Sequence, residues 1–307
     1  ASSQLLKDLK IRGFNNSMAD IYNKSESGDV KTAMLSALSE LAYPQIGELV
    51  NDALAGKNRE LRTTALAMLG KVNIAAELLP EMVSNVMDNG SRADKQSLLQ
   101  SLGEMPLDKT KVVLESLIGQ LKDGGIESAI MLDLEEAVAK SGSADLKTKL
   151  EKARPTETLM DQYTEALQGG NRRLGYQYFN TNSTGQCARC HAIGGQGGTV
   201  GPDLSNIGNT LTREQLLQAL VEPSARLSPG FGTVMLTLKD GQEVTGILEE
   251  ERADELIIRT NDAEPLEVAI ARIAKRENMP SGMPPMAMLM SKREMRDVVE
   301  FLANLRK

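Results

Sequence analysis

Residues 185–204, GQCARCHAIGGQGGTVGPDL, contain both cysteines of the 307-residue chain, Cys187 and Cys190, and its only histidine, His191. Structural cysteines and histidines are usually scattered along a sequence. Their concentration within five consecutive positions indicates that the three side chains serve a single site.

Cys-x-x-Cys-His is the attachment motif of c-type haem. Two thiols one helical turn apart can each form a thioether with a vinyl group of the porphyrin, and the adjacent imidazole can bind the iron. A redox-active Cys-x-x-Cys would need a βαβ context, which is lacking here. A zinc site would need at least three protein ligands, and the chain has no further Cys or His. We therefore predict one covalent haem c, attached at Cys187 and Cys190, with His191 as an iron ligand.

The segments on both sides of the motif also favour haem. In RRLGYQYFNT, Gly175 and Phe179 fall on one helix face, which resembles the N-terminal helix of small cytochromes c, where an aromatic packs beside the haem. GPDL resembles the loop in which a proline carbonyl accepts the N–H of the iron-binding histidine and orients it. We assign that role to Pro202, with an ordinary turn as the alternative, and we expect Phe179 and Leu204 to pack against the haem.

The other iron ligand is expected from a methionine-rich segment, because the chain has no second histidine. Helical methionines are more often core residues than ligands. Three methionines in or beside the last predicted helix are therefore expected to pack: Met288, Met290 and Met295. Met283 lies in the Gly/Pro-rich loop SGMPP, and we predict it as the sixth ligand, with Met279 as the second candidate and Met286 as the third.

Residues 28–155 have the pattern of consecutive amphipathic helices separated by polar or Gly-rich breaks. Leu38, Leu69, Leu102 and Val138 occupy equivalent places in a repeat with spacings of 31, 33 and 36 residues. A helix pair every 30–40 residues is typical of an α-solenoid, and an irregular helical bundle is the alternative. We predict a HEAT-like repeat domain over residues 1–155, serving as a scaffold or docking surface.

Residues 156–307 are expected to form the haem domain, interrupted by strands. Over residues 231–276 the sequence changes to the short apolar runs FGTVMLTL, QEVTGIL, ELIIRT and LEVAIARI, with the hairpin signal Asp240-Gly241 between the first two. We expect four or five strands in a small antiparallel β barrel or sheet. The chain as a whole is thus predicted to be multidomain and mainly α.

The order of these motifs resembles the haem-binding domain family of the Pirellula/Verrucomicrobium type, over roughly residues 170–307. The matching segments are CARCH, GPDL, LVEPSARLSPGFG, LKDGQEVTGIL and SGMPP. The resemblance implies a class I-like cytochrome c domain with a β insertion. Such proteins often carry helical repeats and a propeller similar to PQQ-type sugar dehydrogenases. The propeller is not found here, so we expect no dehydrogenase activity from this chain itself, which would be a subunit or C-terminal part of a dehydrogenase complex.

The expected function is electron transfer by a monohaem c-type cytochrome. Its donor would be a periplasmic dehydrogenase of the PQQ, sugar or alcohol type, and its acceptor a respiratory protein. The alternative is a haem-based sensor or ligand-binding protein with a displaceable sixth ligand. Enzymatic catalysis is not expected, because a histidine committed to haem cannot join a Ser-His-Asp triad and a dihaem peroxidase would need a second CxxCH.

Composition restricts the partners and the compartment. The formal net charge of −7 argues against nucleic-acid binding. No apolar run approaches the roughly 18–20 residues of a membrane-spanning helix. Because haem c is attached after export, we expect an exported protein, in a bacterial periplasm.

The first prediction is that the intact mass exceeds the polypeptide mass by one haem, since two thioethers at Cys187 and Cys190 bind it covalently. Mass spectrometry measures this, and acid–acetone extraction should leave the haem on the protein. An unmodified mass from a strain that matures c-type cytochromes would contradict the prediction.

Overall fold

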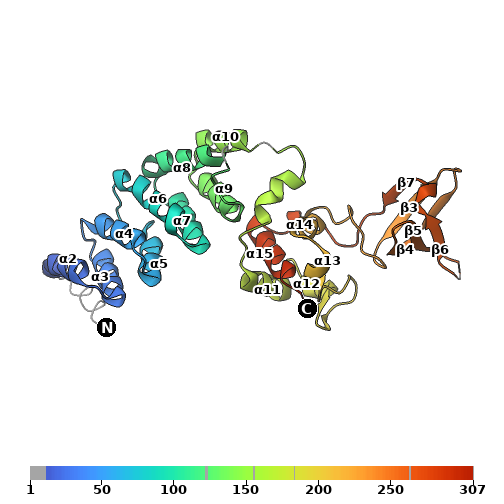
Figure 1. Ribbon diagram of the computed structural model, residues 1–307, viewed down its shortest axis with the longest axis horizontal. Helices are drawn as coiled ribbons and strands as arrows, with labels where there is room; N and C mark the ends of the chain where they lie inside the picture. The colour runs from blue at the N-terminus through green and yellow to red at the C-terminus, as the bar shows by residue number, and fades with distance from the viewer. Residues whose placement is uncertain (1–11, 122–123, 155, 183, 263, 307) are drawn as a thin grey trace. The chain divides into compact units, whose positions relative to one another are not determined.

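The computed structural model describes residues 12–121, 124–154, 156–182, 184–262 and 264–306. The chain divides into two compact units, the first ending at Thr156 and the second beginning at Glu157 (Figure 1). The expected domain boundary at Pro155 lies outside the described residues. None of the helices found in the described ranges is long and apolar enough to cross a membrane.

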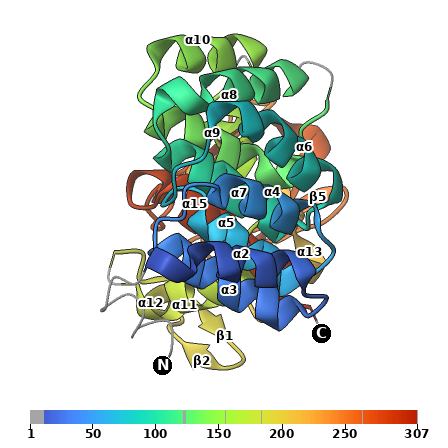
Figure 2. The ribbon, with the colours of Figure 1, turned by 90° about the vertical axis from the view of Figure 1, so that its left-hand side faces the viewer.

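The first unit consists of short helices that follow one another in sequence order (Figures 1 and 2). They are η1 (Arg12–Phe14), α2 (Asn15–Lys24), α3 (Gly28–Glu40), α4 (Ile46–Ala55), α5 (Arg59–Met68), η2 (Ala76–Leu78), α6 (Leu79–Asn89), α7 (Arg92–Glu104), α8 (Leu107–Leu121), η3 (Ser128–Ile130), α9 (Met131–Lys140) and α10 (Ala144–Ala153). Four of them begin where a Ser or Asn side chain accepts a backbone N–H of the first turn, which satisfies an otherwise unpaired donor. These caps are Ser27, Asn58, Ser91 and Ser143.

Alternate helices pack against each other and form two layers. Helices α3, α5, α7 and α9 contact one another in succession, and so do α4, α6, α8 and α10. The four positions predicted to be equivalent, Leu38, Leu69, Leu102 and Val138, lie in or at the end of helices of the first layer, and each is at most 2% exposed. The sequence spacing thus corresponds to one buried position in each successive helix of this layer.

Helix α2 precedes the range in which the sequence pattern indicates helices. It contributes Met18, Ala19 and Tyr22 to the same core. The Tyr22 hydroxyl donates to the Asp52 carboxylate at 2.8 Å and lies 3.1 Å from the Leu49 carbonyl oxygen. Burial and the adjacent Asp52 carboxylate raise the pKa of Tyr22, so this hydroxyl stays protonated and joins α2 to α4.

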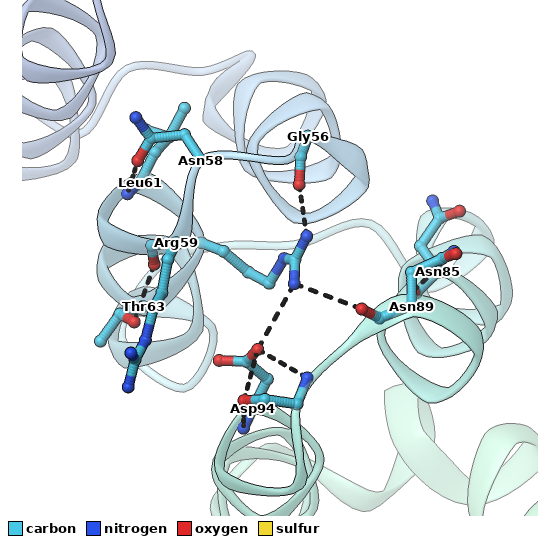
Figure 3. Close-up of polar contacts among 10 residues, drawn as sticks. Gly56, Asn58, Arg59, Leu61, Thr63, Asn85, Asn89 and Asp94 are labelled. Atoms are coloured by element: carbon cyan, nitrogen blue, oxygen red, sulfur yellow. Dashed lines mark hydrogen bonds and ion pairs between the residues drawn. The ribbon is translucent and has the colours of Figure 1, made fainter.

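A buried guanidinium connects successive helices of this unit. Arg62 of α5 donates to the carbonyl oxygens of Gly56 and Asn89 and pairs with Asp94 of α7 at 3.4 Å. Figure 3 shows Gly56, Asn89 and Asp94 approaching this point from three segments. The Arg62 and Asp94 side chains are only 12% and 7% exposed, so each depends on the other for compensation of its charge.

The second unit is built around its last helix. Its elements are η4 (Met160–Ala166), α11 (Arg172–Thr181), α12 (Cys187–Cys190), β1 (Ala192–Ile193), β2 (Gln196–Gly197), α13 (Ile207–Thr210), α14 (Arg213–Val221), β3 (Thr233–Leu238), β4 (Glu243–Glu251), β5 (Glu255–Arg259), β6 (Leu266–Ala269), η5 (Ile270–Arg272), β7 (Ile273–Asn278), η6 (Met286–Met288) and α15 (Lys292–Ala303). Helices α11, α13 and α14 and the short helix η4 all pack on α15. Helix α15 begins with a capping box between Ser291 and Glu294 and buries Val298, Val299, Phe301 and Leu302.

Gly175 allows α11 to cross α15 closely, as the sequence suggests. A Cβ at this position would lie 2.0 Å from the Asp297 carbonyl oxygen, which no side chain could tolerate. Four residues along α11, Phe179 is buried, and its ring centroid lies 5.8 Å from that of Phe301. This crossing therefore aligns the aromatic face of α11 with the core of the unit.

The strands β3 to β7 form an antiparallel sheet of strand order β6-β5-β4-β3-β7. Buried and half-buried residues alternate along β3, as expected for a sheet with one core face. Asp240 and Gly241 make the predicted turn, with Gly241 at φ +88° and the Gln242 N–H donating to Asp240. Within the described residues, β6 and β7 are the unpaired edges, so the element is an open sheet and the barrel considered as an alternative is not formed. The strands span Thr233–Asn278, two residues beyond the expected end.

The second prediction concerns Arg62. Arg62→Ala leaves Asp94 and two carbonyl oxygens without this donor, and should lower the free energy of unfolding of the helical unit by roughly 1–3 kcal/mol. Urea unfolding followed by far-UV circular dichroism measures the change. The haem absorbance, recorded in the same titration, reports the unfolding of the second unit. Arg59→Ala, at an exposed position of the same helix, is the matched control. Equal effects of the two substitutions would contradict the prediction.

Candidate functional site

The seven residues that the sequence assigns to the site all line one cavity of the second unit: Phe179, Cys187, Cys190, His191, Pro202, Leu204 and Met283. The empty space, including the solvent at its open mouth, is about 1280 Å³. Most of the remaining wall is aliphatic, including Ile207, Leu216, Leu220 and Leu302. The cavity thus suits an apolar group.

The Cys-x-x-Cys segment forms the single turn α12, so the two cysteines lie at its ends. The His191 N–H donates to the Cys187 carbonyl at 3.0 Å. Gln186, directly before the turn, has the left-handed backbone angle φ +45°, a conformation that costs energy for a non-glycine residue. Burial raises the pKa of the Cys187 thiol, while Cys190 is exposed. One turn of helix therefore presents two free thiols to the same cavity.

The His191 ring is held by the loop that follows it. Its Nδ1 lies 2.9 Å from the Pro202 carbonyl oxygen, which can only accept a hydrogen bond. The ring proton therefore resides on Nδ1, and Nε2 keeps the lone pair that a metal ion requires. Gly201 packs directly on this ring, because a Cβ there would lie 2.6 Å from Cε1 of His191.

The methionines of the C-terminal segment lie in different surroundings. Met283 is half-buried and Met286 is 3% exposed, and both line the cavity. Met279, the second candidate, is not part of this lining; it is 43% exposed and continues the edge of the sheet through a bond from its N–H to the Thr233 carbonyl at 2.9 Å.

The packing expected of the three methionines near the last helix is found for two of them. Met290 and Met295 are 6% and 0% exposed, whereas Met288 is 82% exposed. The expectation for Met288 is wrong because this residue ends the short helix η6, of which only Met286 is buried.

Sequence reasoning missed residues that complete the lining. Val200 and Phe231 line the cavity although they are 79% and 46% exposed. Arg226 is exposed and, apart from the histidine, is the one basic side chain among the described lining residues. Its guanidinium suits the carboxylate groups that haem carries. No local signal marks Arg226 and Phe231, because they reach the cavity only through the path of the chain between α14 and β3, whereas Val200 directly precedes the GPDL segment, which could have marked it.

The donor set fits haem c better than a bare metal ion. Among the described residues, no group of three or more His, Cys, Asp or Glu side chains could hold a metal ion. Two thiols, one imidazole with Nε2 available and an aliphatic cavity are what a covalently attached haem requires. The absence of a metal cluster in the described part of the chain also gives no support to the zinc alternative.

The comparison with protein families agrees with this chemistry. A sequence model described as Cytochrome c matches residues 173–257, from α11 to β5. A search of curated proteins found no match to the chain. The chain therefore carries a cytochrome c domain in its second unit, and its cofactor is covalently bound haem c.

The third prediction concerns Gly201. In Gly201→Ala, the new methyl group must displace the His191 ring from the Pro202 carbonyl, which should lower the yield of covalently loaded protein and increase the high-spin fraction of ferric haem. Absorbance spectra of the purified protein measure both. Gly282→Ala is the matched control, since a Cβ at Gly282 meets nothing within 4 Å. If the two variants have the same haem loading and the same high-spin fraction, the packing of Gly201 is not what holds the His191 ring in place.

Proposed function

We propose that the cytochrome c domain of this chain is a monohaem electron carrier whose iron is bound by His191 and Met283. The electrons would come from a periplasmic dehydrogenase of the PQQ, sugar or alcohol type and pass to a respiratory acceptor. The observation that carries the proposal is the meeting of Cys187, Cys190, His191 and Met283 at one cavity.

Each of these residues has a distinct task. The two thiols fix the cofactor covalently, His191 supplies an oriented neutral imidazole, and Met283 supplies a thioether. Bound haem provides a one-electron redox couple, and a histidine–methionine ligand pair raises its potential. The aliphatic wall limits the access of water and thereby tunes the same potential.

The order of segments in the second unit supports membership of the Pirellula/Verrucomicrobium-type haem-binding family and a class I-like arrangement. The Cys-x-x-Cys-His turn is followed by the loop at Pro202, the helix α14, the inserted sheet and the loop at Met283. We infer that the sheet is an insertion between α14 and the methionine loop of an otherwise small cytochrome.

We propose that the first unit is a HEAT-like solenoid that docks a partner protein. Its two layers of alternately packed helices support the repeat interpretation, because each helix buries its apolar face only against neighbours in the array. Long helical arrays commonly serve as binding surfaces. The redox partner is the natural candidate for such docking, since electron transfer needs it close to the haem domain.

The proposed location is the bacterial periplasm. The support is chemical, because haem c is attached to exported chains. A location outside the cytoplasm would also place the protein beside periplasmic dehydrogenases and respiratory acceptors.

A haem-based sensor is the competing function, and carbon monoxide distinguishes the two. A thioether that stays on the iron leaves the reduced spectrum unchanged when carbon monoxide is added at neutral pH. Formation of a carbon monoxide complex at low concentration would favour the sensor over the electron carrier.

The fourth prediction is that Met283→Ala converts six-coordinate low-spin ferric haem to a high-spin or water-ligated form. The reduction potential should fall as well, because the thioether favours the ferrous state. Absorbance spectra and a redox titration measure these changes.

Met279→Ala and Met286→Ala are the controls for Met283→Ala. The first alters a residue outside the cavity lining, and the second alters a buried residue of the lining. Loss of the thioether signature in Met279→Ala or Met286→Ala, but not in Met283→Ala, would reassign the ligand.

A further inference from the structure

The two ends of the inserted sheet meet beside the cavity. Val234 of β3 pairs with Asn278 of β7, and the Met279 N–H donates to the Thr233 carbonyl at 2.9 Å. The segments leading into and out of the sheet, residues 223–231 and 281–286, both contribute to the cavity lining. The base of the sheet therefore joins two parts of the cavity wall that are about 50 residues apart in sequence.

Three polar side chains at this base form a continuous series of hydrogen bonds. The Asn278 side-chain amide donates to the carbonyl oxygens of Ser224 and Ala225, each at 3.1 Å. The Ser281 N–H donates to Oγ of Ser224 at 3.0 Å. The Met283 N–H in turn donates to Oγ of Ser281 at 3.1 Å. The series thus ends on the backbone of the predicted iron ligand.

The methionine loop is only partly packed, with Met283 half-buried against the core. Gly282, Pro284 and Pro285 are exposed, and Gly282 has open space where a Cβ would be. A methionine side chain is itself flexible. Polar contacts at its N-terminal side therefore add to the partial burial of Met283 against the core in holding the loop in place.

We propose that Ser224, Asn278 and Ser281 form a clamp, by which the inserted sheet keeps the Met283 loop closed over the haem cavity. This inference rests on the proposed role of Met283 as iron ligand. The three residues are positioning residues, since they act on the iron only through Met283. Ser281 alone would be an ordinary serine turn, but Ser224 lies 57 residues before Ser281 in sequence and ties the loop to the end of α14.

A weaker clamp should increase the population of the open loop. An external ligand that binds only the open form has its apparent affinity multiplied by the open fraction. Imidazole is a suitable probe, because its nitrogen lone pair replaces the thioether sulfur on ferric iron without any change of oxidation state. Tighter imidazole binding therefore reports a looser loop.

The experiment is an imidazole titration of the ferric holoprotein, followed by the disappearance of the thioether charge-transfer band. Ser224→Ala and Ser281→Ala should each bind imidazole about two- to tenfold more tightly than the wild type, which corresponds to the loss of one hydrogen bond. Ser281→Thr keeps the hydroxyl and should restore most of the wild-type affinity. Circular dichroism and the Soret band establish that each variant is folded and loaded.

Ser291→Ala is the matched control. It removes the serine that caps α15, so it lowers the stability of the unit without touching the clamp. Its imidazole affinity should equal that of the wild type. If it matches Ser281→Ala instead, general destabilisation explains the effect and the clamp is rejected.

The same serine substitutions in a Met283→Ala background complete the test. There the loop holds no ligand, so Ser224→Ala and Ser281→Ala should leave imidazole affinity unchanged. Equal effects in both backgrounds, or no effect in either, would overturn the clamp while leaving Met283 as the ligand. A thioether band that persists in Met283→Ala would instead overturn the proposed ligand itself.

Discussion

The hydrogen bond between Nδ1 of His191 and the Pro202 carbonyl, at 2.9 Å, determines how this site can work. It fixes the ring proton on Nδ1 and leaves Nε2 for iron. This hydrogen bond also requires the backbone of residues 198–204 to fold back on α12. The N–H groups of Gly198 and Gly201 hold the backbone there by donating to the carbonyl oxygens of Ala188 and Cys190. Because Gly201 contacts the ring itself, the imidazole can neither rotate nor shift without moving this loop.

The two sides of the site are held in different ways. The histidine side is local: its turn, its orienting carbonyl and its packing glycine all fall within residues 187–202. The methionine side is assembled over long distances in sequence, through Ser224 and Asn278 at the base of the sheet. The histidine side therefore depends only on the local fold of the motif, whereas the methionine side depends on the sheet and on the turn that follows α14.

This difference explains how far the sequence could predict the site. The cysteines and His191 could be assigned because their chemistry depends on a fixed short spacing. Pro202 and Phe179 could be assigned only through the resemblance of their segments to small cytochromes c, and Met283 could only be chosen among three candidates. Arg226 and Phe231 could not be found, because their place at the cavity depends on the route of the chain between α14 and the sheet, whereas Val200, directly before GPDL, could have been found from that segment.

The fold could likewise be predicted only where it leaves a regular or short spacing in the sequence. Repeat spacing identified the buried positions of α3, α5, α7 and α9, since burial at a constant interval leaves a pattern in sequence. The pairing of Arg62 with Asp94, 32 residues apart, leaves no such pattern, and neither does the choice between an open sheet and a closed barrel. Helix α2 was missed because only Met18, Ala19 and Tyr22 form its buried side, too few to mark a period.

The proposed function and its alternative differ in the state of the Met283 loop. An electron carrier keeps this loop closed on the iron, whereas a ligand sensor lets it open. Part of the cavity wall comes from the packed helices α11, α14 and α15, and their rearrangement would disrupt a buried core. The loop at Met283, with Gly282, Pro284 and Pro285 exposed, could open at much smaller cost. Each change of about 1.4 kcal/mol in the free energy of closing alters the open population tenfold. Once haem is attached, an electron carrier and a ligand sensor could therefore share every residue of the histidine side and differ only in how firmly this loop is held.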